Sequence, residues 1–184
     1  MEKKTKKLIA AGVLVWVVLL VFGFFRYAGW KAEQAFLKGI GLFEAGHIDA
    51  AHAQFAQAKK WKANDWEIRE QMGIILLRKG LYDESRAEFA EVLRIKPDYA
   101  EAHKYIGFCY NHEQNLEQAL SAFLKACEVD PSDPMSHELV AVIAEKVGKT
   151  DLALAHWDNI LALDPANKKA LERRALLLDP EPHD

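Results

Sequence analysis

Four segments of the sequence follow one another at a spacing of 34 residues and carry similar residues at equivalent places. They read GHIDAAHAQFAQAKKWKA (46–63), GLYDESRAEFAEVLRIKP (80–97), QNLEQALSAFLKACEVDP (114–131) and GKTDLALAHWDNILALDP (148–165). Each contains a small residue, then an aromatic residue and, in three segments, a final proline: Ala51, Ser85, Ala119 and Ala153; Phe55, Phe89, Phe123 and Trp157; Pro97, Pro131 and Pro165. A fixed period of this length predicts one structural unit that is repeated and stacked along the chain.

The composition of these units predicts helices. The chain has 10 Gly and 6 Pro, and no stretch alternates Val, Ile or Thr with polar residues as a strand would. Glycine recurs with the same period inside the helix that precedes three of the four segments, at Gly39, Gly73 and Gly107, and Ala141 stands at the equivalent place before the fourth. Because glycine costs about 1 kcal/mol relative to alanine within a helix, we expect it to allow close approach of an antiparallel helix at the small residue of the segment. The aromatic residue should then fill the seam against the next unit, and the proline should end the second helix.

These features together resemble the tetratricopeptide repeat, a helix-turn-helix unit. The resemblance covers residues 32–167 as four repeats, 32–65, 66–99, 100–133 and 134–167. It implies an all-α solenoid with a concave inner surface. The first repeat is atypical, because Lys38, Lys59 and Ala63 stand where later repeats carry apolar residues or proline. Apolar residues at helical spacing predict a C-terminal capping helix over residues 168–178, followed by a short tail over 179–184.

The N-terminal segment predicts a transmembrane helix. Residues Leu8 to Phe25 carry no charge, and as a helix they would cover roughly 27 Å, close to the ~30 Å bilayer core. No cleavage site of small residues follows the run, so we expect a retained anchor over residues 8–28 and not a removed signal peptide. A buried core helix is disfavoured, because the run is apolar on every face and no second apolar helix is available to enclose it.

The residues that flank this segment predict its orientation. Lysines precede the run at Lys3, Lys4, Lys6 and Lys7, and aromatic residues follow at Phe24, Phe25, Tyr27 and Trp30. Aromatic residues gather at membrane interfaces, and positive charge favours the cytoplasmic side. We therefore expect residues 1–7 in the cytoplasm and the repeat domain in the periplasm, as in a single-pass protein of a bacterial inner membrane.

Catalysis and metal binding are not predicted. The seven histidines are dispersed and form no H-E-x-x-H motif. His103 and His137 share a repeat position, which the period alone explains, so we expect no metal ion and no cofactor. Cys109 and Cys127 are expected on two antiparallel helices at levels that differ by about 10 Å, too far apart for a disulfide, and hence as buried free thiols. With no nucleophile-and-base arrangement and no phosphate-binding loop, we expect no enzymatic activity and no small-molecule substrate.

The charge distribution argues against nucleic acid as a partner. The chain has 24 Lys and Arg against 27 Asp and Glu, and the lysine cluster lies before the apolar run. The repeats are therefore more acidic than the chain as a whole, and they contain no basic stripe with interleaved aromatic residues. A protein partner is the expectation that remains.

The resemblance implies that a partner binds in the concave groove, on the first helix of each repeat. The residues at these places are Phe36, Ile40, Phe43, Glu67, Glu70, Ile74, Leu77, Glu101, Lys104, Phe108, Asn111 and Glu138. Family members that bind a chaperone's terminal carboxylates carry Lys, Asn, Lys and Arg at four such places. This chain has Phe36, Ile40, Glu101 and Tyr105 there, so a helix or extended apolar segment with basic flanks is the better predicted occupant.

Three functions agree with this pattern. The first is a membrane-anchored scaffold or assembly factor that holds another envelope or membrane protein near the bilayer. The second is a permanent accessory subunit of a multi-subunit membrane complex, which a purified complex of fixed stoichiometry would identify. The third is a cytosol-facing import receptor of an organelle, which requires the opposite topology.

Overall fold

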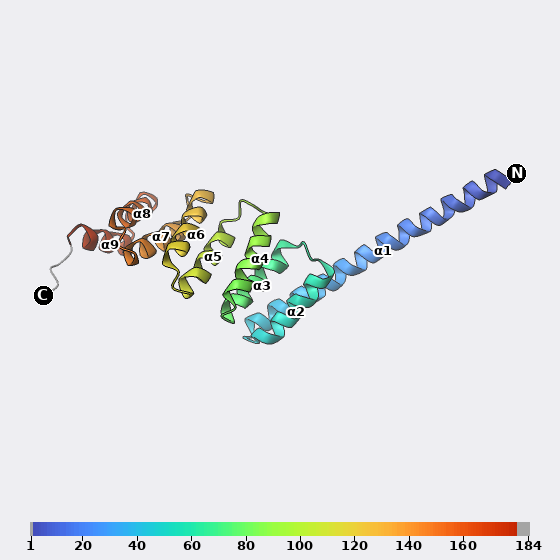
Figure 1. The fold of residues 1–184 in the computed structure, drawn as a ribbon, viewed down its shortest axis with the longest axis horizontal. Coiled ribbons are helices and arrows are strands. Elements are labelled where there is room, and N and C mark those ends of the chain that lie inside the picture. The colour runs from blue at the N-terminus through green and yellow to red at the C-terminus, as the bar shows by residue number, and fades with distance from the viewer. Residues whose placement is uncertain (1, 180–184) are drawn as a thin grey trace. The chain divides into compact units, whose positions relative to one another are not determined.

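The computed structural model describes residues 2–179, with the backbone alone described for residues 2–13 and Val15. All regular structure in this range is helical (Figure 1). The helices are α1 (Glu2–Glu44), α2 (Ile48–Trp61), α3 (Trp66–Arg78), α4 (Tyr82–Ile95), α5 (Ala100–His112), α6 (Leu116–Val129), α7 (Pro134–Lys146), α8 (Thr150–Leu163) and α9 (Lys168–Leu178). The prediction of an all-α solenoid of helix pairs is confirmed. The chain forms two compact units, unit 1 (Met1–Ile68) and unit 2 (Arg69–Asp184), which are described separately.

Unit 1 is built around the helix α1, which runs for 43 residues without a break (Figure 1). Gly29 does not interrupt it. Its C-terminal part packs against α2 around a small core of Ala32, Ala35, Ala58 and Ile68. The first repeat is therefore entered by a rigid helix and not by a flexible linker.

The N-terminal part of α1 exposes a continuous apolar surface. From Leu14 to Phe25, the large apolar side chains that are described are 49 to 69 % exposed. Within the described part of the chain, no helix is long and apolar enough to cross a membrane. Residues 8–13 and Val15, which belong to the expected span, lie outside the residues whose side chains are described. The anchor over residues 8–28 stays a prediction.

Three of the four helix pairs close where an aromatic ring lies over a glycine, and the fourth has Ala141 at the equivalent place. An added Cβ would lie 2.8 Å from the Phe55 ring at Gly39, and 2.6 Å from the Phe89 ring at Gly73. Gly107 makes the same contact with Phe123. The small residue of the segment lies nearby, as Ser85 Oγ donates a hydrogen bond to the carbonyl of Gly73 at 2.8 Å. Close approach at the glycines was expected, but the aromatic ring of the same repeat was not expected to cover them.

The aromatic residue also contacts the next repeat, as predicted. Phe89 stacks on Tyr105 with ring centroids 4.9 Å apart and an interplanar angle of 5°. In unit 2 the helices α4 to α9 pack each against the next. The helix α9 follows α8 and buries Ala170, and Arg174 Nε pairs with Asp158 Oδ1 at 2.6 Å.

The turns within the repeats share one conformation. Glycine has a positive φ at Gly46, Gly80 and Gly148, while Gln114 adopts φ 62° at the equivalent place of the third repeat. In that repeat Asn115 N donates to Tyr110 O at 2.9 Å and Gln114 N to Asn111 O at 3.0 Å. This is the Schellman pattern, which satisfies carbonyls at the end of a helix. The pattern is thus retained even where glycine is absent.

The glycine contact makes a direct prediction for stability. Gly73→Ala should lower the free energy of unfolding by about 1–3 kcal/mol, because the Phe89 ring has to move away from the new methyl group. Gly41→Ala is the matched control, since an added Cβ there meets nothing within 4 Å. It should raise the free energy by up to about 1 kcal/mol through helix propensity. Urea denaturation followed by circular dichroism measures both, and equal effects would show that the ring does not set the helix separation.

Candidate protein-binding surface

The residues expected to line a groove lie on α1, α3, α5 and α7, the first helices of the four pairs. Unit 1 holds Phe36, Ile40, Phe43 and Glu67, and unit 2 holds Glu70, Ile74, Leu77, Glu101, Lys104, Phe108, Asn111 and Glu138. Glu67 is exposed, Lys104 is buried, and the others are partly buried. Each set is considered within its own unit.

A pocket of about 400 Å³ lies in unit 1. It is lined by Ala32, Glu33, Phe36, Leu37, Lys62, Asp65, Glu67 and Ile68. Phe36 and Leu37 supply large apolar surface, and the Leu37 side chain is 58 % exposed. The pocket holds three carboxylates and one ammonium group, that of Lys62, which lies 3.6 Å from Asp65 Oδ2. We call this set of residues the α1–α3 pocket. It joins apolar surface to a negative rim.

The apolar groove positions also support the core. Phe36 packs edge-on against Phe55, with ring centroids 5.5 Å apart. Phe108 makes the same contact with Phe123 at 5.4 Å. Each ring therefore rests on the aromatic residue of its own repeat. Replacing either one would affect stability as well as any binding surface.

Three polar groove positions connect the first helix of one pair to the beginning of the next odd-numbered helix: α3 to the N-cap of α5, α5 to the N-cap of α7, and α7 to α9. The positions are Glu70, Lys104 and Glu138, which are separated by one period. Glu70 accepts a hydrogen bond from the Tyr99 hydroxyl, Lys104 Nζ donates to Asp133 Oδ2 at 2.9 Å, and Lys169 Nζ donates to Glu138 Oε1 at 2.7 Å. We call these the inter-repeat polar contacts. The sequence placed these side chains in the groove, and in the structure they join α3, α5 and α7 to the beginnings of α5, α7 and α9.

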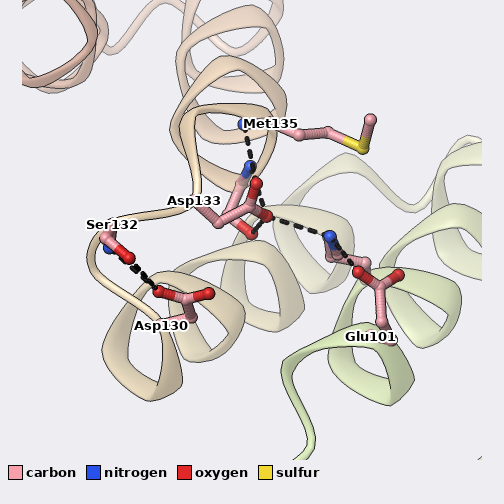
Figure 2. A network of polar contacts seen from close by, with 7 residues as sticks. Glu101, Asp130, Ser132, Asp133 and Met135 are labelled. Atoms are coloured by element: carbon pink, nitrogen blue, oxygen red, sulfur yellow. Dashed lines mark hydrogen bonds and ion pairs between the residues drawn. The ribbon is translucent and has the colours of Figure 1, made fainter. Parts of the chain in front are cut away.

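The contact of Lys104 belongs to a network around Asp133 (Figure 2). Asp133 caps the N-terminus of α7, accepting from Met135 N at 3.1 Å and from Ser136 N at 3.2 Å. Lys104 also pairs with Glu101. Burial disfavours the charged forms, yet the hydrogen bonds to Glu101 and Asp133 raise the pKa of Lys104. Burial likewise opposes ionisation of Asp133, but hydrogen bonds from Ser136 and Lys104 keep its pKa below the usual range.

One groove residue has an unsatisfied acceptor. The side-chain oxygen Oδ1 of Asn111 is buried and has no hydrogen-bond partner within the described part of the chain. Buried polar atoms are nearly always paired in folded proteins.

Two histidines and a cysteine meet inside unit 2. Cys127 on α6, His137 on α7 and His156 on α8 are buried, and one potential ligand atom from each lies within 4.8 Å of the others. The two Nδ1 atoms of the histidines are 2.9 Å apart, and His137 Nε2 lies 3.0 Å from Pro131 O. Burial raises the pKa of Cys127 to about 11. Burial and the neighbouring His137 lower the pKa of His156 to about 4. The prediction that both cysteines are buried free thiols is confirmed.

The sequence contained a signal for this cluster. His137 and His156 are 19 residues apart, and so are Arg69 and Glu88, which form a 2.9 Å ion pair at the same places two repeats earlier. The spacing therefore marks two facing positions within a repeat. In the sequence, His137 was related to His103 because the two share a repeat position, and His156 was not identified as the residue that faces it. Leu37 was also missed, since it is apolar but lies outside the groove positions of the family.

A family model described as "Tetratricopeptide repeat" matches residues 36–100 and 70–134, which together cover more than half of the chain. No curated protein sequence matches the chain.

Solved structures of low sequence identity share the fold. MamA, residues 41 to the end, from Desulfovibrio magneticus RS-1 superposes with a TM-score of 0.68 at 22 % identity, covering 74 % of this chain and 77 % of that one. YrrB, "a TPR protein with an unusual peptide-binding site", gives 0.64 at 17 % identity, covering 78 % and 74 %. The first such domain of Spaghetti (RPAP3), bound to an HSP90 peptide, gives 0.61 at 16 % identity, covering 65 % and 95 %.

The network around Asp133 predicts unequal effects for two nearby aspartates (Figure 2). Asp133→Ala removes the cap of α7 and one partner of a buried ammonium, and should cost about 2–4 kcal/mol of unfolding free energy. Asp130→Ala is the control, since the Asp130 carboxylate accepts hydrogen bonds from Ser132 N and Oγ within its own turn. It should cost less than about 1 kcal/mol. Urea denaturation measures both, and similar losses would contradict a special role for the Lys104 contact.

Proposed function

This chain belongs to the tetratricopeptide repeat family, and from that premise we propose that it is a non-enzymatic scaffold that binds another protein. The observation that carries the proposal is the α1–α3 pocket, where Phe36 and the exposed Leu37 adjoin three carboxylates. Apolar surface gives a segment affinity, and the acidic rim favours one with basic flanks.

The partner class follows from this chemistry. A helix or extended segment with apolar side chains and neighbouring Lys or Arg fits the pocket. The fold neighbours include proteins whose names state peptide binding, YrrB and the RPAP3 domain. Their identity to this chain is too low to transfer a ligand, so the partner is assigned from the pocket alone.

We further propose that the N-terminal half of α1 anchors the chain in a bacterial inner membrane. The support is the run of exposed large apolar side chains between Leu14 and Phe25, because large exposed apolar patches commonly mark sites of protein or membrane interaction. Lys31 Nζ lies 5.6 Å from the Tyr27 ring centroid and 5.2 Å from that of Trp30. Aromatic residues beside cations are typical of a membrane interface. By the lysine bias of residues 1–7, the repeat domain would face the periplasm and hold a membrane or envelope protein close to the bilayer.

The pocket can be tested with a single exposed residue. Leu37→Glu should reduce recovery of the specific partner from solubilised membranes at least tenfold, which is about 1.4 kcal/mol. Because Leu37 is 58 % exposed, unfolding should change by no more than about 0.5 kcal/mol. Leu163→Glu on α8 is the matched control, as Leu163 is 49 % exposed and does not line the pocket. Mass spectrometry of affinity-purified wild type and variants measures recovery, and equal loss in both variants would argue against the pocket.

The anchor can be tested by fractionation. The full chain should remain with membranes after alkaline carbonate treatment and be released by detergent, whereas a chain without residues 2–28 should be found in the soluble fraction. The repeats begin after residue 31, so helicity and thermal unfolding of the truncated chain serve as the control for folding. Release of the full chain by carbonate would exclude a spanning anchor.

A further inference from the structure

The side chains of Cys127, His137 and His156 come from three successive helices of unit 2. Thiolate and imidazole are the donors that Zn²⁺ prefers, at about 2.3 Å for sulfur and 2.0–2.1 Å for nitrogen. Such bond lengths in a tetrahedron place ligand atoms roughly 3.3–3.8 Å apart. In the structure the two Nδ1 atoms lie 2.9 Å apart. Cys127 Sγ and one nitrogen of each ring lie within 4.8 Å of one another. These separations bracket the ones that a bound zinc ion requires.

Hydrogen bonds fix which nitrogens are available. The carbonyl of Pro131 can only accept, so the 3.0 Å contact requires a proton on His137 Nε2. In the neutral ring His137 Nδ1 is then a bare acceptor, and it faces His156 Nδ1. Metal-binding histidines commonly donate their other N–H to a backbone carbonyl, which holds the ring in orientation. His137 is in that arrangement before any ion binds.

We infer that Cys127 Sγ, His137 Nδ1 and His156 Nδ1 form a binding site for one Zn²⁺ ion. The ion takes the place of the proton shared between the two rings. His156 then carries its proton on Nε2, and the Cys127 thiol loses one proton to solvent, so about one proton is released for each ion bound. Water or a donor from a partner completes the tetrahedron.

The ion would connect the third repeat to the fourth. Cys127 lies on the last helix of repeat three, and both histidines lie in repeat four. The equivalent facing positions in repeat two, Arg69 and Glu88, form an ion pair. In repeat three they are His103 and Ala122, which cannot form a pair of ligands. The site is therefore specific to the junction of the last two repeats.

Zinc binding to the full chain, free of any histidine tag and stripped with chelator, tests this inference. Titration with ZnCl₂ against a chromophoric chelator should give one tightly bound ion per chain and a rise in melting temperature. Cys127→Ser and His156→Gln should each weaken zinc binding by more than about tenfold. Loss of a residue that only hydrogen-bonds to a metal ligand already weakens binding by about ten- to a hundredfold. Cys109→Ser and His103→Gln are matched controls, because they alter the other buried thiol and the period-related histidine.

The absorption spectrum of bound Co²⁺ reports on the metal ligands and does not change through an effect on folding alone. Co²⁺ should give a thiolate-to-metal charge-transfer band in wild type and Cys109→Ser, and no such band in Cys127→Ser. Circular dichroism of each stripped variant establishes that it is folded before titration. Absence of a stoichiometric ion in wild type, tight binding that persists in Cys127→Ser, or binding of Cu⁺ but not Zn²⁺ would overturn the assignment.

Discussion

The contact between a mid-helix glycine and the aromatic ring of the same repeat sets the separation of the two helices in the first three pairs. Gly73 and Phe89 make it in unit 2, and Gly39 and Phe55 make it in unit 1. Any side chain at the glycine would occupy the space of the ring. The opposite side of the ring is then free to meet the next repeat, as Phe89 does with Tyr105. One residue thus fixes both the pair and the stacking of pairs.

The proposed binding surface depends on this packing in turn. Phe36 and Phe108 rest on Phe55 and Phe123, so their exposed faces are held in place by the core. The inter-repeat polar contacts add specificity to the stacking, because Glu70 and Lys104 each pair with the N-cap residue of the next odd-numbered helix. A buried ammonium such as that of Lys104 is costly without both carboxylates. If one repeat were displaced by one helical turn relative to the next, these pairs would be lost.

Sequence reasoning recovered what depends on period and residue type. The helix pairs, the close approach at the glycines and the burial of both thiols follow from local patterns repeated every 34 residues. The sequence did not predict contacts that depend on the direction in which a side chain points between two helices. Lys104 was placed in the groove because its position faces inward in the family, yet its long stem carries the ammonium to Asp133 at 2.9 Å. The meeting of Cys127 with His137 and His156 was missed for the same reason, since it joins three helices.

The unbroken helix α1 gives unit 1 a defined geometry along its own axis. A continuous α-helix is rigid, so Glu33, Phe36 and Leu37 keep a fixed distance and a fixed rotation about the helix axis relative to its N-terminal half. One residue added between them would raise these side chains by about 1.5 Å and turn them by roughly 100° about the axis. If the N-terminal half is held in a bilayer, the number of residues between that half and the α1–α3 pocket determines how far from the membrane surface the pocket lies and in which direction it faces about the helix axis.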